Sequence, residues 1–310
     1  MIKVKFVGGI KPNSTKEIWG GSKATFNSMI KSLENSKEIN FIYRTRIDFK
    51  TFKEFKDFLD DGDISHVDDT GVITQMFIEG SDPPDIIGPI VRSPIKRYKG
   101  WECLYTPEWF YKARVIRLNY NEERKNHELV SLIRHGVDIN YLIPTNKKKK
   151  YVLWAGNKNR YAKNYPLMEQ IMNMKLPRGY KFKIMHNYNV EDYWKVLDNT
   201  AILVNTSRYE SFCCALFEAR AKGVATIQPI GLNGYGVHEN APVQIEYNVE
   251  AYQKKILELL ENKNYEKVGK KCREYCVNNA SLEIMGEDLT KIYKEVYNEK
   301  RKSKFYKKLF

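Results

Sequence analysis

Short apolar runs alternate with longer amphipathic segments along most of the chain. Runs of this length are typical of buried strands, and apolar residues three and four positions apart are typical of one helix face. In the second half of the sequence, the predicted strands are 151–155, 180–185, 201–205 and 224–228. The predicted helices are 165–174, 190–198, 212–222, 249–262, 264–278 and 281–297. Strands that alternate with helices favour a parallel, doubly wound sheet.

The first half of the chain shows a similar alternation. Its predicted elements are strands at 3–7, 39–43, 64–67, 85–91 and 114–118 and helices at 24–33 and 52–59. Residues 78–112 are rich in proline, tryptophan and tyrosine, and most of them match no regular pattern. The polar, lysine-rich run 145–150 is the predicted linker between the two halves of the chain, because the next predicted strand, 151–155, follows it directly.

The pattern predicts an α/β protein with two Rossmann-like domains that face a central cleft. We place the first domain at 1–145, the second at 146–285, and a closing helix with a basic tail at 286–310. A length of 310 residues suits two domains of ordinary size, each with its own core.

The composition is that of a globular protein, with 42% hydrophobic and 29% charged residues. No segment reaches the ~18 apolar residues of a membrane span. The start of the chain has no signal-peptide cleavage pattern. The five cysteines are odd in number and lie in apolar or helical contexts, which favours reduced thiols. We therefore expect a cytoplasmic protein.

The net charge of +14 favours anionic partners, which include lipid headgroups, nucleic acid and phosphorylated substrates. A lysine-rich surface without a specific partner is the plain alternative. The charge is most concentrated at 300–310, where basic residues alternate with Phe305, Tyr306, Leu309 and Phe310. This composition suits the surface of an anionic membrane. A solvated chain end is the alternative there.

Two glutamates, Glu210 and Glu218, stand eight positions apart between two predicted strands. Glu210 falls in the turn after strand 201–205, where βαβ units bind ligands. Glu218 falls about two helical turns further along. Each carboxylate can accept hydrogen bonds from ligand hydroxyls, and the free N–H groups at the start of the helix can hold an anion. A ligand with hydroxyl, anion and hydroxyl in a row is a sugar nucleotide.

This segment resembles the Glu-x7-Glu motif of retaining GT-B glycosyltransferases, in particular glycosyltransferase family 4 (glycosyl transferases group 1). Residues 134–144 resemble the turn that closes the family's first domain, and 151–163 resemble the strand and basic loop that open its second. The tail 272–293 resembles the family's closing helices. The resemblance covers about 130–297. It implies a GT-B fold and the transfer of a sugar, with retention, from a nucleoside diphosphate to an acceptor hydroxyl.

The resemblance also implies roles for individual residues of the motif. Glu218 would accept hydrogen bonds from the ribose, with a solvated helix glutamate as the alternative. Glu210 would contact and orient the donor sugar, which makes it a catalytic candidate. The backbone N–H groups of Phe212, Cys213 and Cys214 would bind the diphosphate. Many family members have glycine where Cys213 stands, so this position departs from the family pattern.

The loop after Gly156 supplies the basic candidates of the donor site. The family uses an arginine and a lysine in this loop to neutralise the leaving diphosphate, since preorganised cations stabilise its growing charge. Lys163 matches the lysine, whereas Asn157 occupies the usual arginine position. Arg160 or Lys158 would substitute for the missing arginine. A generally basic surface loop is the alternative.

Further candidates lie in the first half of the chain. Gly20 and Gly21 resemble the family's glycine loop near the donor phosphate and the acceptor, with a plain turn as the alternative. His66 resembles a family histidine that faces the donor sugar, and it is the second catalytic candidate. A histidine at the edge of the core is the alternative. We interpret the Asp-x-Asp run of Asp61 and Asp63 as a turn, and we expect no metal site.

We therefore expect a metal-independent, hexosyltransferase-type glycosyltransferase with no cofactor beyond its co-substrate. The donor would be a nucleotide sugar, UDP- or GDP-linked, and the acceptor a glycan or a lipid-linked glycan. The product would belong to a glycan, a glycolipid, or a cell-envelope or capsid polysaccharide. Peripheral contact with an anionic membrane fits the charge, and no nucleic acid partner is expected. Two alternatives are a GT-B sugar-nucleotide epimerase and a catalytically inactive, basic binding protein with the same fold.

Overall fold

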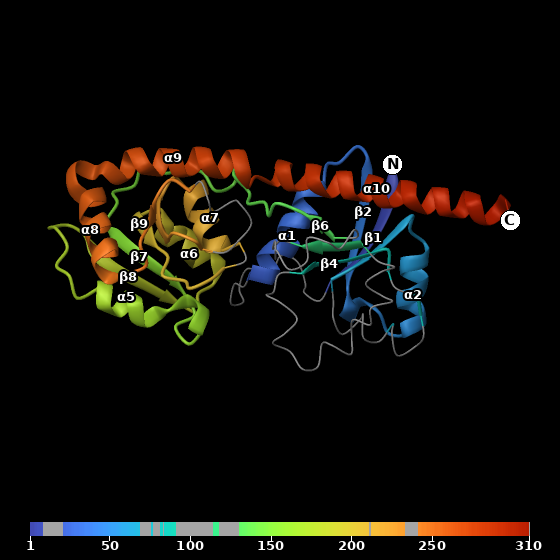
Figure 1. Cartoon of the computed structure of the whole chain (residues 1–310), viewed down its shortest axis with the longest axis horizontal. Helices are drawn as coiled ribbons and strands as arrows, with labels where there is room; N and C mark the ends of the chain where they lie inside the picture. The colour runs from blue at the N-terminus through green and yellow to red at the C-terminus, as the bar shows by residue number, and fades with distance from the viewer. Residues whose placement is uncertain are drawn as a thin grey trace. The chain divides into compact units, whose positions relative to one another are not determined.

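The structure is a computed structural model, and it describes residues 1–8, 21–68, 76, 81–82, 84–90, 114–117, 130–210, 212–232 and 241–309. The chain divides into two compact units (Figure 1). The first unit holds Met1–Asn13, Thr25–His135 and Glu283–Phe310, and the second holds Ser14–Ala24 and Gly136–Leu282. The predicted closing segment 286–310 therefore belongs to the first unit.

The first unit contains a parallel sheet with the strand order β2-β1-β3-β4-β5-β6. Its strands are β1 (Ile2–Gly8), β2 (Ile39–Thr45), β3 (Ile64–Val67), β4 (Ile86–Ile90), β5 (Arg114–Arg117) and β6 (Val130–Leu132). Its helices are α1 (Gly21–Leu33), the short 3-10 helix η1 (Arg46–Asp48), α2 (Phe52–Asp60) and α10 (Leu282–Leu309). Alternate side chains of β1 point to opposite faces of this sheet. Val4 and Phe6 pack against α1 and α10, whereas Val7 packs against α2.

The long C-terminal helix α10 completes the core of the first unit (Figure 1). Met285, Leu289 and Tyr293 are fully buried, and they recur at the spacing of one helix face. The helix lies so close to α1 that a Cβ atom added at Gly286 would be 2.5 Å from the carbonyl oxygen of Ser32. Glycine at this position therefore allows the two helices to pack.

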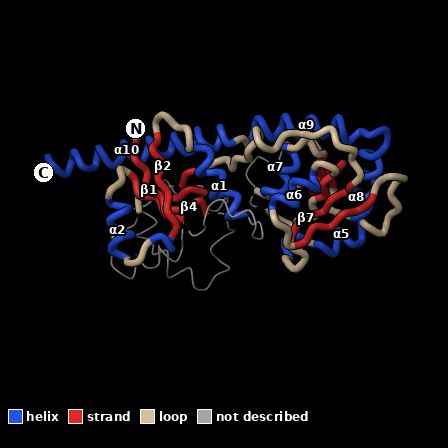
Figure 2. Tube along the Cα trace, turned by 180° about the vertical axis from the view of Figure 1, so that it is seen from behind, coloured by secondary structure: helices blue, strands red, loops and turns tan. Residues whose placement is uncertain are grey.

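The second unit contains a parallel sheet with the order β11-β10-β9-β7-β8. The strands of this sheet are red in Figure 2, where β7 is labelled. Its strands are β7 (Tyr151–Gly156), β8 (Lys181–His186), β9 (Thr200–Val204), β10 (Ala225–Pro229) and β11 (Gln244–Ile245). Its helices are η4 (Tyr161–Lys163), α5 (Tyr165–Ile171), α6 (Val190–Leu197), α7 (Cys214–Ala221), α8 (Val249–Leu260), η5 (Glu261–Lys263) and α9 (Asn264–Asn279). From β7 the chain continues to β8 on one side and later to β9 on the other. The carboxyl ends of β7 and β9 therefore form a topological switch point, the usual ligand site of such sheets.

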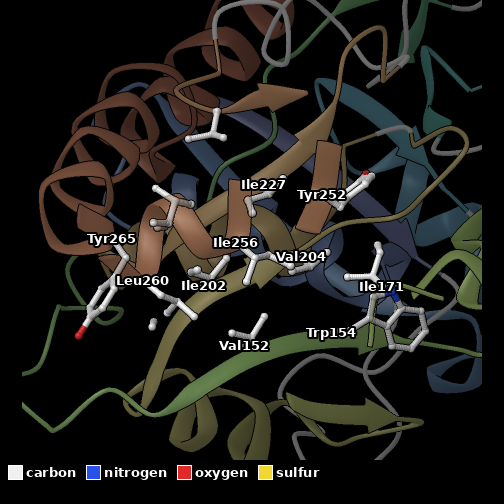
Figure 3. Close-up of a cluster of buried hydrophobic side chains, with 14 of the residues drawn as sticks. Val152, Trp154, Ile171, Ile202, Val204, Ile227, Tyr252, Ile256, Leu260 and Tyr265 are labelled. Carbon is white, nitrogen blue, oxygen red and sulfur yellow. The ribbon is translucent and has the colours of Figure 1, made fainter. Parts of the chain in front are cut away.

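Both faces of the second sheet are covered, which explains why β9 and β10 are buried at every position. The edge strand β8 keeps exposed residues. On one face, Val152, Ile202 and Ile227 pack against α5 and α8 (Figure 3). On the other face, Leu153 and Leu203 pack against α6 and α7. The layers thus hold the first turn of α7 at the carboxyl edge of the sheet.

Side-chain caps determine where several of these helices begin. Asn189 accepts a hydrogen bond from the backbone N–H of Asp192 at the start of α6, at 2.8 Å. Asn248 accepts one from Ala251 at the start of α8, also at 2.8 Å. Such caps satisfy N–H groups that have no partner within the helix. Within the described part of the chain, no helix is both long enough and apolar enough to cross a bilayer.

Candidate functional site

The predicted donor residues of the second unit meet at the switch point between β7 and β9. Gly156 ends β7, and Lys163 ends the short helix η4 that follows it. Glu210 lies in the loop between β9 and α7, and Cys213 precedes the first residue of α7. The fold therefore brings together residues that are 47 positions apart in the sequence, Lys163 and Glu210.

Lys163 and Glu210 form an ion pair through Nζ and Oε1, and both side chains are mostly buried. The hydroxyl of Ser207 donates to the same Oε1 at 2.6 Å. Burial alone would raise the pKa of Glu210, but the charge of Lys163 and these hydrogen bonds outweigh it and hold the pKa below its usual value. Burial alone would lower the pKa of Lys163, but the charge of Glu210 holds it above its usual value. The site therefore keeps a cation and an anion at neutral pH.

The backbone around Lys163 is held by a chain of hydrogen bonds from the sheet. The indole Nε1 of Trp154 donates to Oγ1 of Thr206 at 2.9 Å. That hydroxyl donates in turn to the carbonyl oxygen of Lys163, also at 2.9 Å. A Cβ atom added at Gly156 would be 3.2 Å from the Trp154 ring and 3.6 Å from Cδ of Lys163. Glycine at this position therefore allows the Trp154 ring to lie close to the backbone, and the donor-binding role of Gly156 stays a prediction.

Cys213 stands immediately before α7 with φ 65° and ψ 69°, in the left-handed region. This region costs a residue with a side chain roughly 1–2 kcal/mol, whereas glycine adopts it freely. The Sγ atom accepts a hydrogen bond from Asn205 at 3.6 Å. Burial, together with the charge of Glu210, raises the pKa of the Cys213 thiol to about 12, so the thiol stays protonated. The position where the family has glycine is thus one where the backbone conformation favours glycine.

We expect Cys213→Gly to increase the free energy of unfolding by about 0.5 kcal/mol. The variant removes left-handed strain of ~1–2 kcal/mol, and the greater freedom of glycine in the unfolded chain offsets about 0.4–1 kcal/mol of that. Urea denaturation measures the difference. Cys214→Gly is the matched control, because the same change in the first turn of α7 should instead lower stability by about 1 kcal/mol. Equal losses in both variants would contradict the strain argument.

Glu218 lies in the middle of α7, and its side chain is buried, with 3% of the residue exposed. Its Oε2 accepts a hydrogen bond from the indole Nε1 of Trp194 on α6, at 3.2 Å. The negative charge of Glu218 contributes, after burial, to raising the pKa values of Tyr188 and Cys214. Those two side chains therefore lie near this carboxylate, at the same end of the sheet.

The other candidates of the second unit have distinct places around this site. Arg160 is exposed and precedes η4, and its charge acts on Lys163 rather than on a paired carboxylate. Phe212 is buried, and its ring stacks on that of Phe217 with centroids 4.1 Å apart. Cys214 is the first residue of α7, where backbone N–H groups have no partner within the helix.

The candidates of the first unit are placed differently. His66 is fully buried in β3, and its Nδ1 lies 2.9 Å from the hydroxyl of Tyr293 on α10. Its ring also meets that of Phe6 edge-on, with centroids 4.7 Å apart. This packing favours a core role, and the catalytic role stays a prediction. Gly20 lies outside the described residues, and Gly21 is the first residue of α1.

Several side chains that build the site were not singled out in the sequence. Ser207 and Thr206 had a usable signal, because polar residues directly after a buried strand lie at the ligand-facing edge. Trp154 and Trp194 had no signal in the sequence, because each indole donates a hydrogen bond to a residue far along the chain, Thr206 and Glu218 respectively. Lys163, Asn205, Ser207 and Cys213 also line a small cavity of about 10 Å³, room for one water molecule. Among the described residues, no group of histidine, cysteine and acidic side chains could hold a metal ion.

No protein-family model and no curated protein matches the sequence. Solved structures do match the fold. A glycosyltransferase of Rickettsia africae has a TM-score of 0.66 at 14% identity, over 95% of this chain and 98% of that one. HepE of Anabaena, in complex with UDP and glucose, has a TM-score of 0.65 at 11% identity, over 94% of this chain and 99% of that one.

An alpha-glucosyltransferase in complex with UDP and DNA also matches, with a TM-score of 0.63 at 12% identity, over 95% of this chain and 100% of that one. These neighbours are glycosyltransferases, and together with the two parallel sheets they show the GT-B fold. The predicted fold class is confirmed in this respect.

Proposed function

We propose that this protein is a retaining glycosyltransferase that moves a sugar from a nucleoside diphosphate to an acceptor hydroxyl. The observation that carries the proposal is the Lys163–Glu210 ion pair at the start of α7, with Glu218 about two turns further along the helix. The GT-B fold of the neighbouring structures supports it.

In this proposal the diphosphate lies at the N-terminus of α7, where the N–H groups of Phe212, Cys213 and Cys214 face it. Lys163 supplies a cation at this site, and its ion pair with Glu210 keeps it protonated. Negative charge grows on the leaving phosphate as the sugar–phosphate bond breaks, and a fixed cation stabilises it without reorganisation. Arg160 adds a second positive charge from the exposed side of the loop.

The two glutamates would hold the ends of the donor. Glu210 accepts hydrogen bonds from the donor sugar and orients it, and Glu218 accepts hydrogen bonds from the ribose. We propose a front-face mechanism, in which the leaving phosphate guides the acceptor hydroxyl to the face that it has just left. Metal ions and cofactors have no part in the proposal, because the lysine, the arginine and the helix N–H groups meet the diphosphate charge.

UDP is the first choice of donor nucleotide, ahead of GDP, because both HepE and the alpha-glucosyltransferase are recorded with UDP. For the acceptor we propose a glycan or a lipid-linked glycan of an envelope, capsid or glycolipid pathway. The protein would work in the cytoplasm, with peripheral contact to an anionic membrane through its basic surface. We propose a hexosyl group as the sugar that is transferred, because HepE is recorded in complex with UDP-glucose.

DNA is a second candidate acceptor, and two observations favour it. The net charge is +14, and the structurally similar alpha-glucosyltransferase is recorded with DNA that contains an HMU base. A transfer assay with UDP-glucose separates the two candidates. Incorporation of glucose into duplex DNA with an HMU base, but not into a lipid-linked glycan, would favour the DNA acceptor.

The donor site is tested by isothermal titration of wild type and Glu218→Ala with UDP, GDP, ADP, TDP and CMP in the presence of EDTA. We expect one nucleotide, UDP first, to bind the wild type. We expect the variant to bind it about 100-fold more weakly, because two hydrogen bonds to a carboxylate are lost. Binding in EDTA would agree with a metal-independent site.

Glu169→Ala is the matched control, because Glu169 is an exposed glutamate on α5 of the same unit. It should bind the nucleotide as the wild type does. If no nucleotide binds the wild type, the transferase proposal fails and the basic binding protein moves ahead. If UDP-sugar is bound and its sugar is epimerised without an acceptor, the epimerase alternative is the correct one.

A further inference from the structure

Trp194 donates a hydrogen bond to an oxygen of Glu218 from another helix. It lies on α6 and is half-buried, and its Nε1 is 3.2 Å from Oε2 of Glu218. Helix α6 is itself tied to the start of α7, because the hydroxyl of Tyr193 donates to the carbonyl oxygen of Ala215 at 2.6 Å. The donor and the acceptor of the Trp194–Glu218 hydrogen bond therefore belong to two helices in fixed contact.

The indole of Trp194 also contacts a second aromatic ring. The ring of Tyr141 meets it at 62°, with centroids 5.2 Å apart, in the loop that opens the second unit. Tyr141 is 62% exposed, so the pair reaches the surface of the unit. Edge-to-face contacts of this kind fix ring orientation. Because the indole plane is fixed, the direction of its N–H toward Glu218 is fixed as well.

A carboxylate can take a ribose only in certain orientations. Its two oxygens offer about four lone-pair directions, and the vicinal 2′ and 3′ hydroxyls of a ribose need two of them on one side. A tryptophan N–H is a donor only, so it can occupy one direction on Oε2 without competing as an acceptor. A hydrogen bond from a donor on another helix also limits how the carboxylate can rotate, because the bond keeps its geometry only over a narrow range of angles. Such a bond holds the carboxylate plane before any ligand arrives.

We propose that Trp194 is a positioning residue for the donor: its N–H sets the Glu218 carboxylate to receive both hydroxyls of the ribose. The proposal rests on the proposed function, since Glu218 is there the ribose ligand. It deepens that function, because it makes the Trp194–Glu218 pair the part of the site that distinguishes a ribonucleotide from a nucleotide without the two hydroxyls. Trp194 itself does not touch the reacting atoms.

The test is isothermal titration of wild type and Trp194→Phe with UDP and with 2′,3′-dideoxy-UDP. We expect the wild type to bind UDP at least tenfold more tightly than the dideoxy nucleotide. Trp194→Phe keeps an aromatic ring and removes the N–H, so UDP binding should weaken about tenfold. Binding of the dideoxy nucleotide should change by less than twofold. The ratio of the two affinities then falls toward one, and this ratio is independent of the fraction of protein that is folded.

Trp154→Phe is the matched control. It also removes a buried indole N–H from the second unit, but that N–H supports the carbonyl of Lys163 through Thr206. Trp154→Phe should weaken the binding of UDP and of the dideoxy nucleotide by the same factor. The ratio of the two affinities should therefore stay unchanged. Tyr141→Leu is the second variant, because Tyr141 is exposed and its loss leaves the fold intact. This variant should let the Trp194 indole move more freely. The affinity for UDP should then fall by less than in Trp194→Phe, and the affinity for the dideoxy nucleotide should stay the same.

Three outcomes would overturn the proposal. If Trp194→Phe weakens the binding of both nucleotides equally, Trp194 contributes only to the packing of the unit. Tighter UDP binding in that variant would mean that the indole competes with the ribose. If Trp194→Phe does not fold, an unchanged affinity ratio in Tyr141→Leu decides against the proposal. A wild type that does not bind UDP at all overturns the proposed function as well, and this result is distinct from the other three.

Discussion

Lys163→Met is expected to lower kcat/KM for sugar transfer by about a thousandfold. The variant keeps the length of the side chain and removes the cation of the Lys163–Glu210 ion pair. Loss of a preorganised group that stabilises developing charge costs about 100- to 1000-fold in rate, and the loss of donor affinity adds to it. Release of UDP from UDP-glucose, followed under saturating acceptor, measures the effect.

Lys175→Met is the matched control, because Lys175 is an exposed lysine of the same unit, in the loop after α5. We expect this variant to lose less than tenfold. Glu210→Gln tests the other half of the pair, and it should also reduce transfer, because Lys163 is no longer held in place. If Lys163→Met keeps more than a tenth of the wild-type rate, the diphosphate is neutralised elsewhere.

The same ion pair makes a prediction about acid stability. The pKa of Glu210 is lowered in the folded protein, so the pair stabilises the fold above the unfolded pKa of the carboxyl, and this stability is lost as the pH falls through the folded value. In Lys163→Met the carboxylate is left buried without its cation, which costs about 3–5 kcal/mol at neutral pH. That loss should shrink on acidification, because Glu210 can then take up a proton.

Gly269→Ala is expected to lower the free energy of unfolding by about 3 kcal/mol, the upper end of the usual cost of overpacking. A Cβ atom at this position of α9 would be 2.1 Å from the carbonyl oxygen and 3.1 Å from the carbonyl carbon of Gly223. Both contacts are with backbone, so no side chain can turn away. Helix α9 would have to move off the turn between α7 and β10. Urea denaturation measures the loss.

Whether Gly269→Ala lowers or raises the free energy of unfolding shows whether α9 packs closely on Gly223. An alanine in an open helix interior is about 1 kcal/mol more favourable than glycine, so without the contact Gly269→Ala would stabilise the protein. Lys270→Ala, at the next and exposed position of α9, is the control and should change stability by less than 0.5 kcal/mol. A stable Gly269→Ala variant would show that α9 does not pack closely on the turn.

The elements of the second unit could be predicted closely from the sequence. The predicted strand 151–155 and helix 190–198 differ by one residue from β7 and α6. These elements are bounded by strong local signals: apolar runs for the strands, and an asparagine cap for the helix. The short edge strand β11 (Gln244–Ile245) was missed, because two residues give no periodic pattern.

The C-terminal helix was predicted only as far as 297, whereas α10 continues to Leu309. The apolar spacing that reveals a helix ends at Val296, and the basic residues beyond it show no face. Lysine, arginine and glutamate are good helix formers, and no proline or glycine interrupts them. The helix propensity of these residues therefore extends α10 beyond the part that packs against the core.

The candidate site could be predicted in part. The order of strand, loop and helix predicts that Glu210 and Glu218 follow the carboxyl end of β9. This prediction needs only local sequence patterns. The surroundings of His66 could not be predicted, since its hydroxyl partner Tyr293 is 227 residues away. The same holds for Trp194, whose role depends on the angle between two helices and not on any motif.

The route of the chain also determines when each unit can be finished during synthesis. All of the second unit has been translated by Leu282, whereas the first unit still lacks α10. Until Met285 and Tyr293 have been added, only one of the two helices that pack on Val4 and Phe6 is present, namely α1. The N-terminal unit thus completes its core after the C-terminal one, the reverse of the usual order on the ribosome. During that interval the part of this face that α10 covers is exposed.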